Sequence, residues 1–366
     1  MSGTTERIQM SQIVKAPITV LVPAHNEADQ IAETIESLMN QTLRPSKIIV
    51  IADNCTDDTV AVASRYPVTV METVGNSHKK AGALNQAWLA HAQDAKFIFS
   101  MDADTVLSSN FFELAMNLME DQPDVGGACV CPTTKPIPED ASRYGAILWR
   151  LWRLDFGGYM RTLCRWKMAP EVLSGIGTIL RGTALKEVAL EYGGAPWDVN
   201  SIVEDYRLSL DLRRLGYRLS IIPGALAFTD APIRIGGAQG LWRQRMRWSG
   251  GTWQELVREG WEPRSRRIWL TTLGCAGASV LRVVAVLLWL TVLALGYDIA
   301  WSWWWLIPLV ISIVDRLDML RYTKNSDWKD TLMVLSFLPI EIVCVLREAW
   351  TVRSAWITLR RHSLAW

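Results

Sequence analysis

Short apolar runs alternate with segments of helical periodicity over the first part of this 366-residue chain. The run from Ile18 to Val22 is closed by Pro23, and apolar residues then recur at helical spacing between Ile31 and Met39. Such alternation predicts an α/β fold with a mostly parallel sheet covered by helices. The further elements we expect are strands at 47–52, 68–71 and 97–101 and helices at 58–64 and 81–91.

Polar loops follow three of the expected strands. They cover residues 23–27, 53–57 and 102–104. In an open parallel sheet ligands bind beyond the carboxyl ends of the strands, so these loops predict a ligand site of the nucleotide-binding kind. No G-x-x-x-x-G-K-[ST] motif occurs, and the glycines at 175–182 have the wrong spacing for a dinucleotide fingerprint. The sequence therefore disfavours a P-loop ATPase or a dehydrogenase.

The two parts of the chain differ in charge and in tryptophan content. Residues 1–140 carry 9 basic and 18 acidic residues, whereas residues 141–366 carry 29 and 19. Of the 19 tryptophans, Trp88 alone precedes residue 140, and tryptophan is favoured at membrane–water interfaces. With 50% hydrophobic and 20% charged residues, disorder, collagen and a wholly nucleic-acid-coating protein are excluded. We interpret the chain as a soluble head at 1–263 and a membrane region at 264–366.

Cysteine usage and the N-terminal sequence indicate where the head resides. The six cysteines show neither C-x-x-C spacing nor the density of a disulfide scaffold, which favours a reducing compartment. The first fifteen residues lack the apolar core of a signal peptide. We therefore expect a cytoplasmic head on a multi-pass protein of the cell (inner) membrane.

Three apolar segments predict two or three transmembrane or re-entrant helices. Residues 268–295 are apolar except for Arg282 and exceed the roughly 20 residues that cross a hydrocarbon core. Residues 299–320 form a shorter candidate, with tryptophans at 301 and 303–305 to mark the far interface. Residues 331–348 contain Pro339 and Glu341, costly at a bilayer centre, so this segment is re-entrant or interfacial. The arginines that follow prefer the cytoplasm.

Two segments of the head are expected to be interfacial helices. Residues 143–168 place three tryptophans among six basic residues, which suits a helix lying on anionic lipid. Residues 238–258 are similarly basic and rich in tryptophan. The alternative for each is a basic face that packs on its own domain.

Asp102 and Asp104 directly follow an expected strand. Residues i and i+2 of an extended segment project the same way, so the two carboxylates converge. Such a pair suits Mg²⁺ or Mn²⁺, whose remaining positions are filled by water and phosphate oxygens. The alternative is that the aspartates merely end the strand and cap the next helix.

Three other residues lie on loops of the same rim. Asp53 ends the second strand, where an acidic side chain can accept hydrogen bonds from a base or ribose, although an Asx turn is an equal alternative. Glu27 follows the expected strand at 18–22, and Lys80 precedes the expected helix at 81–91. The lysine can neutralise phosphate charge, or it can be an ordinary solvated side chain.

Two later segments carry candidate chemistry. Glu204 and Asp205 begin an amphipathic helix, where the helix dipole alone favours carboxylates, but Asp205 is also placed to act as a general base. Gln244 and Arg247 lie three residues apart on one helix face beside Trp248. That face can hold a pyrophosphate and stack a sugar, or it can belong to a basic interfacial helix.

Taken in order, the motifs PAHNE (23–27), Asp53, KAGALN (80–85), Asp102-Ala-Asp104, Glu204-Asp205 and QRMRW (244–248) resemble those of family 2 glycosyltransferases. The resemblance covers about 17–255 and is closest to the membrane-embedded, processive subgroup of cellulose, hyaluronan, chitin and chitooligosaccharide synthases. It implies a Rossmann-like fold of the GT-A type that binds a nucleotide sugar.

The resemblance also implies residue roles. Asp205 matches the catalytic base, and Val203 stands where threonine is usual before the carboxylate pair. Asp104 matches a metal ligand, together with Asp102. The implied donor-binding residues are Ala24, His25, Glu27, Asp53, Lys80, Asp102, Gln244, Arg247 and Trp248, and the implied acceptor-binding residues are Gly175, Gly177, Thr178, Glu204 and Trp248.

The reaction implied by the resemblance is a metal-dependent inverting transfer of a sugar from UDP to a growing β-linked poly- or oligosaccharide. The implied partners are a UDP-sugar, a carbohydrate or glycolipid acceptor and the lipid bilayer, with no nucleic acid and a possible homo-oligomer. Two alternatives stay open: transfer of a single sugar to a lipid or protein, and a non-catalytic membrane-anchored sensor of nucleotide sugars.

Overall fold

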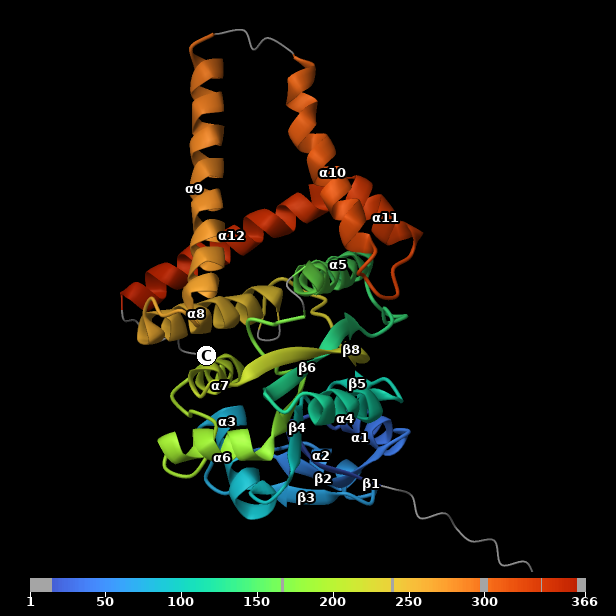
Figure 1. Cartoon of the computed structure of the whole chain (residues 1–366). Coiled ribbons are helices and arrows are strands. Elements are labelled where there is room, and N and C mark those ends of the chain that lie inside the picture. Colours follow the sequence, from blue (N-terminus) through green and yellow to red (C-terminus); the bar gives the residue numbers. More distant parts are fainter. Residues whose placement is uncertain (1–14, 166–167, 238–239, 297–301, 337, 361–366) are drawn as a thin grey trace, which may run out of the picture.

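The computed structural model describes residues 15–165, 168–237, 240–296, 302–336 and 338–360. An α/β body carries a hairpin of two helices that projects from one end (Figure 1). The first part of the body follows the expected order. Its elements are β1 (Lys15–Ala24), α1 (Ile31–Met39), β2 (Arg44–Ala52), α2 (Thr59–Ala63), β3 (Thr69–Glu72), α3 (Lys79–Ala87), a π-helical turn (Trp88–Ala92) and β4 (Phe97–Met101).

The second part of the body completes the sheet and adds longer helices. It comprises β5 (Val106–Leu107), α4 (Phe111–Asp121), β6 (Val125–Thr134), α5 (Arg143–Arg165), β7 (Gly177–Arg181), α6 (Gly182–Glu191), α7 (Glu204–Arg214), β8 (Arg218–Thr229) and α8 (Leu241–Glu259). The C-terminal elements are α9 (Arg266–Ala294), a 3₁₀ turn (Trp303–Trp305), α10 (Leu306–Leu320), α11 (Trp328–Leu335) and α12 (Leu338–Leu359).

The eight strands form one sheet in the order β3-β2-β1-β4-β7-β6-β8-β5. The α/β class is confirmed, and β1 to β4 are parallel as expected. The later half differs, because β7 runs antiparallel to both β4 and β6, and β5 runs antiparallel to β8. The sheet is therefore mixed rather than mostly parallel. The physical reason is that the connection through α5 stays at the edge where β6 ends, so β7 enters the sheet from that edge and runs against its neighbours.

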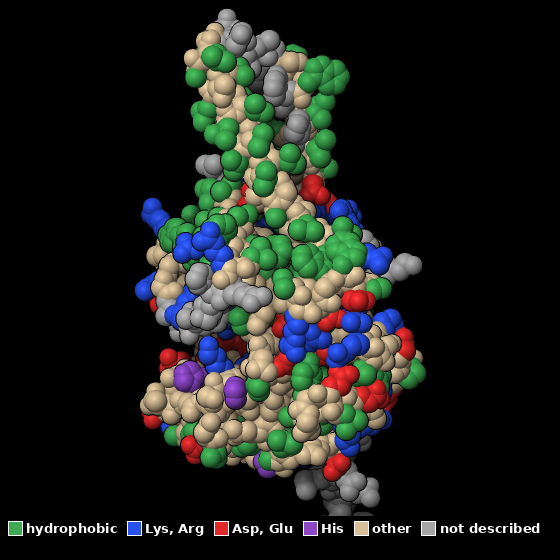
Figure 2. Space-filling view, turned by 90° about the vertical axis from the view of Figure 1, so that its left-hand side faces the viewer, with side chains coloured by type: hydrophobic (Ala, Val, Ile, Leu, Met, Phe, Trp, Pro, Cys, Tyr) green, Lys and Arg blue, Asp and Glu red, His purple; other side chains and the backbone are tan. Residues whose placement is uncertain are grey.

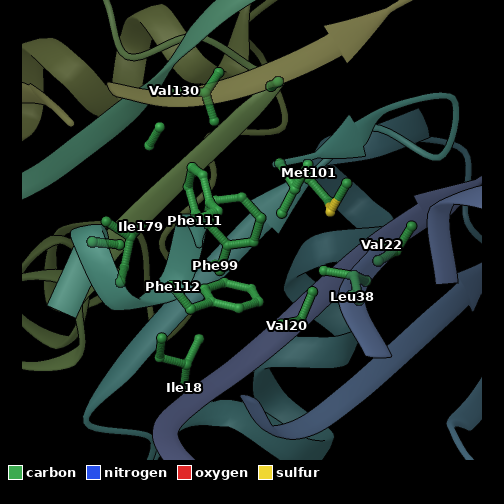
Figure 3. Packing of buried hydrophobic residues seen from close by; sticks show 14 of the residues in the cluster. Ile18, Val20, Val22, Leu38, Phe99, Met101, Phe111, Phe112, Val130 and Ile179 are labelled. Carbon is green, nitrogen blue, oxygen red and sulfur yellow. The ribbon is translucent and has the colours of Figure 1, made fainter. Parts of the chain in front are cut away.

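A hydrophobic core holds β4 in the middle of the sheet. The rings of Phe99, Phe111 and Phe112 pack on one another with centroids 4.9 to 5.3 Å apart (Figure 3). Ile18 and Val20 of β1 complete this cluster, and all five side chains are fully buried. Each aromatic pair adds about 0.5–1.5 kcal/mol beyond the burial of its area. This packing fixes the strand from which Asp102 and Asp104 emerge.

One helix has the length and composition that the membrane prediction requires. Among the residues that the structure describes, α9 is the one helix long and apolar enough to cross a membrane. α10 has 15 residues, fewer than the roughly 20 that a full crossing takes, and 299–301 of its expected span lie outside the described residues. The segment expected at 331–348 is divided between α11 and α12.

Helix α5 differs from the lipid-facing helix expected at 143–168. Trp149 and Trp152 are buried, and so are the side chains of Arg150 and Arg153. The two arginines pair with Asp330, which follows α10 in the chain. These residues therefore form a basic face that packs on its own protein, which is the alternative to a helix lying on lipid. The sequence could not reveal this, because the acidic partner lies some 180 residues away; residues 166–167 are outside the described part.

Candidate active site

The polar loops come together at one edge of the sheet. β1, β2 and β4 are parallel neighbours, so the loops after Ala24, Ala52 and Met101 share that edge. Two later segments also reach it. The Gly175 N–H donates to Asp205 Oδ2 at 3.0 Å, which joins the turn before β7 to the first turn of α7. The site therefore combines loops from the parallel half of the sheet with segments from the mixed half.

Asp53 lies in a corner of polar side chains at the end of β2. It is 7% exposed, and its Oδ1 accepts hydrogen bonds from Thr73 Oγ1 at 2.8 Å, Asn76 Nδ2 at 2.8 Å and Asn54 Nδ2 at 3.0 Å. His25 Nδ1 lies 2.6 Å from the Asp53 carbonyl oxygen. All three side-chain bonds use Oδ1, so Oδ2 is the oxygen available to a ribose or base.

The loops after β1 and β2 are held to each other. The Glu27 N–H donates to Thr59 Oγ1 at 2.8 Å, and the Thr56 N–H donates to Asn26 Oδ1 at 2.7 Å. Asn26 and Asn54 both adopt left-handed backbone conformations, with φ of 57° and 50°. Asparagine tolerates this region better than most residues, and such conformations gather at functional sites. Ala24, the last residue of β1, is buried beneath these loops.

Glu27, Asp102 and Asp104 form an acidic group at the rim. Burial and repulsion from Asp104 and Asp102 raise the pKa of Glu27 to about 7. Burial and repulsion from Asp102 raise the pKa of Asp104 to about 6. The loop is anchored beneath them, because Thr34 Oγ1 donates to the buried Ala103 carbonyl at 2.6 Å. This group is short of positive charge.

Two carboxylates, rather than a complete ligand shell, are what this group offers a metal ion. No three or more His, Cys, Asp and Glu side chains converge in a metal-binding arrangement within the described residues. Mg²⁺ and Mn²⁺ are bound by one or two carboxylates together with water and substrate phosphates. The carboxylate oxygens of Asp102 and Asp104, and the raised pKa of Asp104, fit a divalent cation that arrives with a phosphorylated ligand.

Lys80 connects the acidic rim to α7. Its Nζ lies 2.5 Å from Asp102 Oδ1, 3.6 Å from Glu204 Oε1 and 3.2 Å from the Gly175 carbonyl oxygen. Burial by itself would lower the pKa of Lys80, but the carboxylates of Asp102, Glu204 and Asp205 outweigh it and raise the pKa above its ordinary value. The lysine is therefore a fixed cation between the two carboxylate groups, rather than a solvated side chain.

Asp205 is held at the start of α7 by backbone donors. Its Oδ2 accepts from the Gly175 N–H at 3.0 Å and its Oδ1 from the Tyr206 N–H at 2.7 Å. Burial, together with repulsion from Glu204, raises the pKa of Asp205 to about 6, while Lys80 acts in the opposite direction. A carboxylate with this pKa is mostly ionised at pH 7 and still accepts a proton readily.

A small pocket opens between Lys80 and Asp205. Asn85 fixes one wall, because its side chain donates to the Trp197 carbonyl at 2.7 Å and accepts from the Trp197 N–H at 3.0 Å. A Cβ at Gly175 would lie 3.0 Å from Asp205 Oδ2 and 3.2 Å from Lys80 Nζ, so glycine keeps this space open. The lining residues are Lys80, Leu84, Ser100, Leu173, Ser174, Gly175, Thr178, Leu180, Trp197, Glu204, Asp205 and Leu208.

Thr178 and Gly177 take different positions. Thr178 lines the pocket and donates to the Ser174 carbonyl at 2.8 Å. Gly177 is buried at the start of β7, and a Cβ there would lie 2.7 Å from Val130 Cγ1 and 3.0 Å from Phe99 Cζ. Its small size therefore serves the packing of the sheet.

The QRMRW residues are on α8, above α7 in Figure 1. Arg247 is exposed, Trp248 packs on Trp152 with ring centroids 5.9 Å apart, and Gln244 Oε1 is buried with no hydrogen-bond partner among the described residues. Arg245, which the sequence did not single out, lies 4.3 Å from the Trp152 ring and pairs with Asp155. No hydrogen bond or ion pair in the described structure joins Gln244, Arg247 or Trp248 to the carboxylates.

Several residues of the site were missed by the sequence reasoning. Thr73 and Asn76 bond Asp53 and follow β3, so their place after a parallel strand was a signal that could have found them. Lys135, directly after β6, forms ion pairs with Glu33 at 2.8 Å and with Asp230 at 3.8 Å, and its charge partly opposes the rise in the pKa of Asp104. Nothing local in the sequence marks Lys135.

Family models match this arrangement of strands and polar loops. The model described as glycosyl transferase family 2 matches residues 19–169, and that of glycosyl transferase family group 2 matches residues 97–315, more than half of the chain. The chain belongs to glycosyl transferase family group 2. It is a glycosyltransferase, as the sequence motifs predicted.

Curated relatives of this glycosyltransferase include poly-beta-1,6-N-acetyl-D-glucosamine synthases. That of Staphylococcus aureus is 25% identical over 248 residues, which cover 66% of this chain and 56% of the relative. That of Staphylococcus epidermidis is 25% identical over 250 residues, which cover 67% and 56%. The glycosyltransferase thus spans about half the length of the curated relatives that it matches.

A solved structure shares the fold. The mannosyltransferase PcManGT from Pyrobaculum calidifontis, in complex with GDP-Man and Mn²⁺, matches with a TM-score of 0.56 and 16% identity over 95% of this chain and 88% of that one. At this identity the similarity establishes the fold, an α/β arrangement of the GT-A kind.

Proposed function

We propose that this glycosyltransferase is an inverting enzyme that transfers a sugar from a UDP-sugar to a hydroxyl group of a growing β-linked poly- or oligosaccharide. The observation that carries the proposal is the position of Asp205, a buried carboxylate fixed by the N–H groups of Gly175 and Tyr206 at the wall of the pocket. Its pKa of about 6 suits a general base that works near pH 7.

In this proposal the donor lies along the rim of the sheet. Asp53 Oδ2 accepts a hydrogen bond from the uridine. Glu27 lies between the uridine and the diphosphate, near Asp102 and Asp104. The acceptor hydroxyl, held between Glu204 and Thr178, gives its proton to Asp205 and attacks the anomeric carbon. The bond from that carbon to the diphosphate oxygen breaks on the opposite face, so the configuration inverts and UDP leaves.

Stabilisation of the leaving group is the larger contribution. Lys80 is a fixed cation between Asp102 and Glu204. Preorganised charge in a water-poor site lowers the activation free energy by on the order of several kcal/mol. Asp102 and Asp104 would hold the Mg²⁺ or Mn²⁺, which when bound supplies positive charge to the diphosphate. The raised pKa values of Glu27 and Asp104 support a site that gains from such a cation.

The nature of the product is proposed from the relatives. Synthases of poly-beta-1,6-N-acetyl-D-glucosamine are 25% identical to this chain, which supports a β-linked polymer and makes UDP-N-acetylglucosamine the first donor to test. The QRMRW segment on α8, with Gln244, Arg247 and Trp248, supports the same class through its resemblance to processive synthases.

The test is UDP release by the 366-residue chain in detergent across a panel of UDP-sugars, with Mg²⁺ or Mn²⁺ and with products sized by mass spectrometry. We expect a ladder of products from one donor and no turnover by Asp205→Asn, which keeps the size of the side chain but cannot take the proton. The matched control is Asp94→Asn, because the Asp94 side chain is fully exposed and does not line the pocket.

Other outcomes would revise the proposal. One added sugar per acceptor would indicate single transfer to a lipid or protein. Full turnover by Asp205→Asn would remove that residue from the role of base. UDP binding without turnover, for every donor and acceptor, would favour the sensor.

A further inference from the structure

Helix α8 packs closely against the start of α7, the helix that begins with the carboxylate pair. Gly251 of α8 is buried, and a Cβ at this position would lie 2.6 Å from both Cγ1 and Cγ2 of Val203. Carbon atoms do not approach one another this closely, so the contact requires a glycine. Val203 is the N-cap of α7 and directly precedes Glu204 and Asp205. The spacing between the two helices is therefore set beside the proposed base.

A buried arginine joins the same two helices further along. Arg207 is 3% exposed, and its Nη1 donates to Glu255 Oε2 at 3.3 Å and to Glu259 Oε2 at 3.2 Å, both on α8. Its Nε donates to both oxygens of Asp211 at 3.1 Å, within α7. Glu255 and Asp211 are fully buried. Displacement of either helix would leave buried charges without partners, which is costly, so Arg207 fixes how α7 lies against α8.

The residues that make and support these contacts recur every four positions along each helix. Residues four apart lie on one face of a helix, so each set forms a single stripe. We call the two stripes together the α7–α8 seam. Its members are Val203, Arg207 and Asp211 at the start and along α7, and Gly251, Glu255 and Glu259 on α8.

The segment that leads into α7 is tied to α8 as well. The side chain of Gln254 accepts a hydrogen bond from the Ile202 N–H at 3.4 Å and donates to the Asn200 carbonyl at 3.3 Å. Arg258 pairs with the buried side chain of Asp198. α8 thus holds both the approach to α7 and its first turns.

The same face of α8 carries two of the QRMRW residues. Gln244 and Trp248 precede Gly251 by seven and three residues, so they continue the stripe of the seam along α8. In the part of the chain that the structure describes, QRMRW reaches the carboxylates through no hydrogen bond or ion pair. The seam is therefore the contact that relates the position of Asp205 to that of QRMRW.

Arg207 does not line the active-site pocket. It lines a separate cavity of about 300 Å³, whereas Leu208, the next residue of α7, lines the pocket that contains Asp205. On the face shown in Figure 2, basic and acidic side chains lie next to one another below the projecting hydrophobic hairpin. An effect of Arg207 on the reaction would thus pass through the position of α7 and not through contact with substrate.

We propose that Gly251 and Arg207 are positioning residues for the transfer reaction: the close contact and the ion pairs of the seam hold α7 where Asp205 meets the acceptor. This inference rests on the proposed role of Asp205 as the base. A shift of α7 would move Asp205 away from the Gly175 N–H, to which its Oδ2 is bonded at 3.0 Å. Misplacement of a reacting group by about 1 Å can cost roughly 100-fold in rate.

The first test changes the glycine of the seam in the 366-residue chain in detergent and follows UDP release with the donor that gives turnover. We expect Gly251→Ala to lower kcat about 10- to 100-fold. The KM for the UDP-sugar should stay within about twofold, because the donor binds to loops of the sheet that the seam does not touch. The matched control is Gly277→Ala on α9, another helical glycine, where a Cβ meets open space. This variant should keep the kcat of the parent.

Removal of the opposing methyl groups should restore the reaction. Gly251→Ala combined with Val203→Ala should turn over within about threefold of Val203→Ala alone, because the added Cβ then takes the space of the lost methyl groups. General damage to the fold would not be repaired by a second truncation. Absence of this recovery would overturn the inference.

The second test changes the arginine of the seam. Arg207→Lys keeps the charge but lacks the planar fork that binds three carboxylates at once, and we expect kcat to fall about tenfold with the same KM. The control is Arg218→Lys, which alters an exposed pair with Asp124 outside the seam. Equal kcat values for the two lysine variants would overturn the role of Arg207.

Asp205→Asn, measured beside these variants, separates failure of this inference from failure of the proposed function. If Asp205→Asn is inactive and Gly251→Ala turns over like Gly277→Ala, the proposed function stands and the seam has no positioning role. If Asp205→Asn keeps the turnover of the parent, both are overturned.

Discussion

Two clusters of charged side chains in this protein use the same residue types and balance them differently. At the sheet edge, Lys80 faces Asp102, Glu204 and Asp205, and the pKa of Asp205 is raised to about 6 by burial and by Glu204. Between α5 and α11, Arg150 and Arg153 face Asp327 and Asp330, and the hydrogen bond from Arg150 lowers the pKa of Asp327 to about 2.

The comparison teaches how to separate a working site from a structural clamp. The balanced cluster satisfies its own charges, and its members gain little from any ligand. The unbalanced cluster, which lies at the sheet edge and includes Glu27 and Asp104, holds more carboxylates than cations, and it gains from a cation, a proton or a phosphate-bound metal. We therefore assign the unbalanced cluster at the sheet edge to chemistry. The balanced cluster, formed by Arg150, Arg153, Asp327 and Asp330, holds the C-terminal region on α5.

The largest expected effect falls on the balanced cluster. Asp330 is fully buried and accepts from Arg150 at 2.9 Å and from Arg153 at 3.2 Å. Asp330→Ala leaves the buried Arg153 without a carboxylate and Arg150 with Asp327 alone, and it should lower the free energy of unfolding by about 3–5 kcal/mol. Thermal or denaturant unfolding in detergent measures it. Asp318→Ala, which breaks the more exposed pair with Arg165, should cost about 1 kcal/mol or less; equal losses would contradict the contrast.

The unbalanced cluster should respond in the opposite way. Asp104→Asn removes a proposed metal ligand and should reduce turnover about 100-fold, the cost of losing charge stabilisation at the leaving group. Because the native state holds this carboxyl with a raised pKa, its removal should leave the melting temperature unchanged or higher. Turnover and melting of the same preparation check both. A large fall in melting temperature would show that Asp104 is structural.

The pH dependence separates the clusters without mutation. Turnover should fall about tenfold per pH unit below pH about 6, as Asp205 takes up a proton. In the absence of metal and UDP, the raised pKa values of Glu27 and Asp104 mean that the native state binds protons more tightly than the unfolded chain. Stability should therefore rise as the pH falls from 8 toward 6.

The balanced cluster should not change its contribution to stability between pH 8 and pH 6. The lowered pKa of Asp327 contributes stability above its ordinary value of 3.8, and this is lost as the pH falls toward 2. Melting temperatures between pH 8 and 6 for the parent and for Asp104→Asn test the assignment. Identical profiles for the two proteins would contradict it.

The smallest expected effect is at Gly175, which lies beside Asp205 and Lys80. Gly175→Ala places a Cβ 3.0 Å from Asp205 Oδ2 and 3.2 Å from Lys80 Nζ, so the two side chains must shift by a few tenths of an ångström. We expect about a tenfold loss of turnover, since small misplacement of a reacting group is costly. Gly236→Ala, where a Cβ meets open space, is the control. Equal turnover of both variants would show that Asp205 tolerates displacement.

Local sequence patterns were sufficient for the parallel half of the fold. The runs that end at Ala52 and Met101 are apolar and bounded by turns, and each became a strand of the expected direction. The order of β5 to β8 was not accessible, because it depends on pairing between strands that are far apart in the sequence. The same limit hid the partners of Arg150 and Arg153, which lie far along the chain.

The candidate site divides in a similar way. Asp102, Asp104 and Asp53 were found because they directly follow strands, where parallel topology gathers them. The meeting of Lys80 with Glu204 and the hydrogen bond from Gly175 to Asp205 depend on long-range packing of α7 against the turn before β7. Val203 shows the remaining limit: it caps α7 without a side-chain bond, and its methyl groups pack on Gly251 of α8, which no local pattern predicts.

Calorimetric titration of UDP into the parent protein and into Asp104→Asn, each with and without Mn²⁺, tests the central claim most directly. We predict that Mn²⁺ strengthens UDP binding to the parent by tenfold or more, about 1.4 kcal/mol, and has no effect on the variant. Binding of UDP that is equally strong in all four titrations would contradict the assignment of the unbalanced cluster to a metal-bound nucleotide donor.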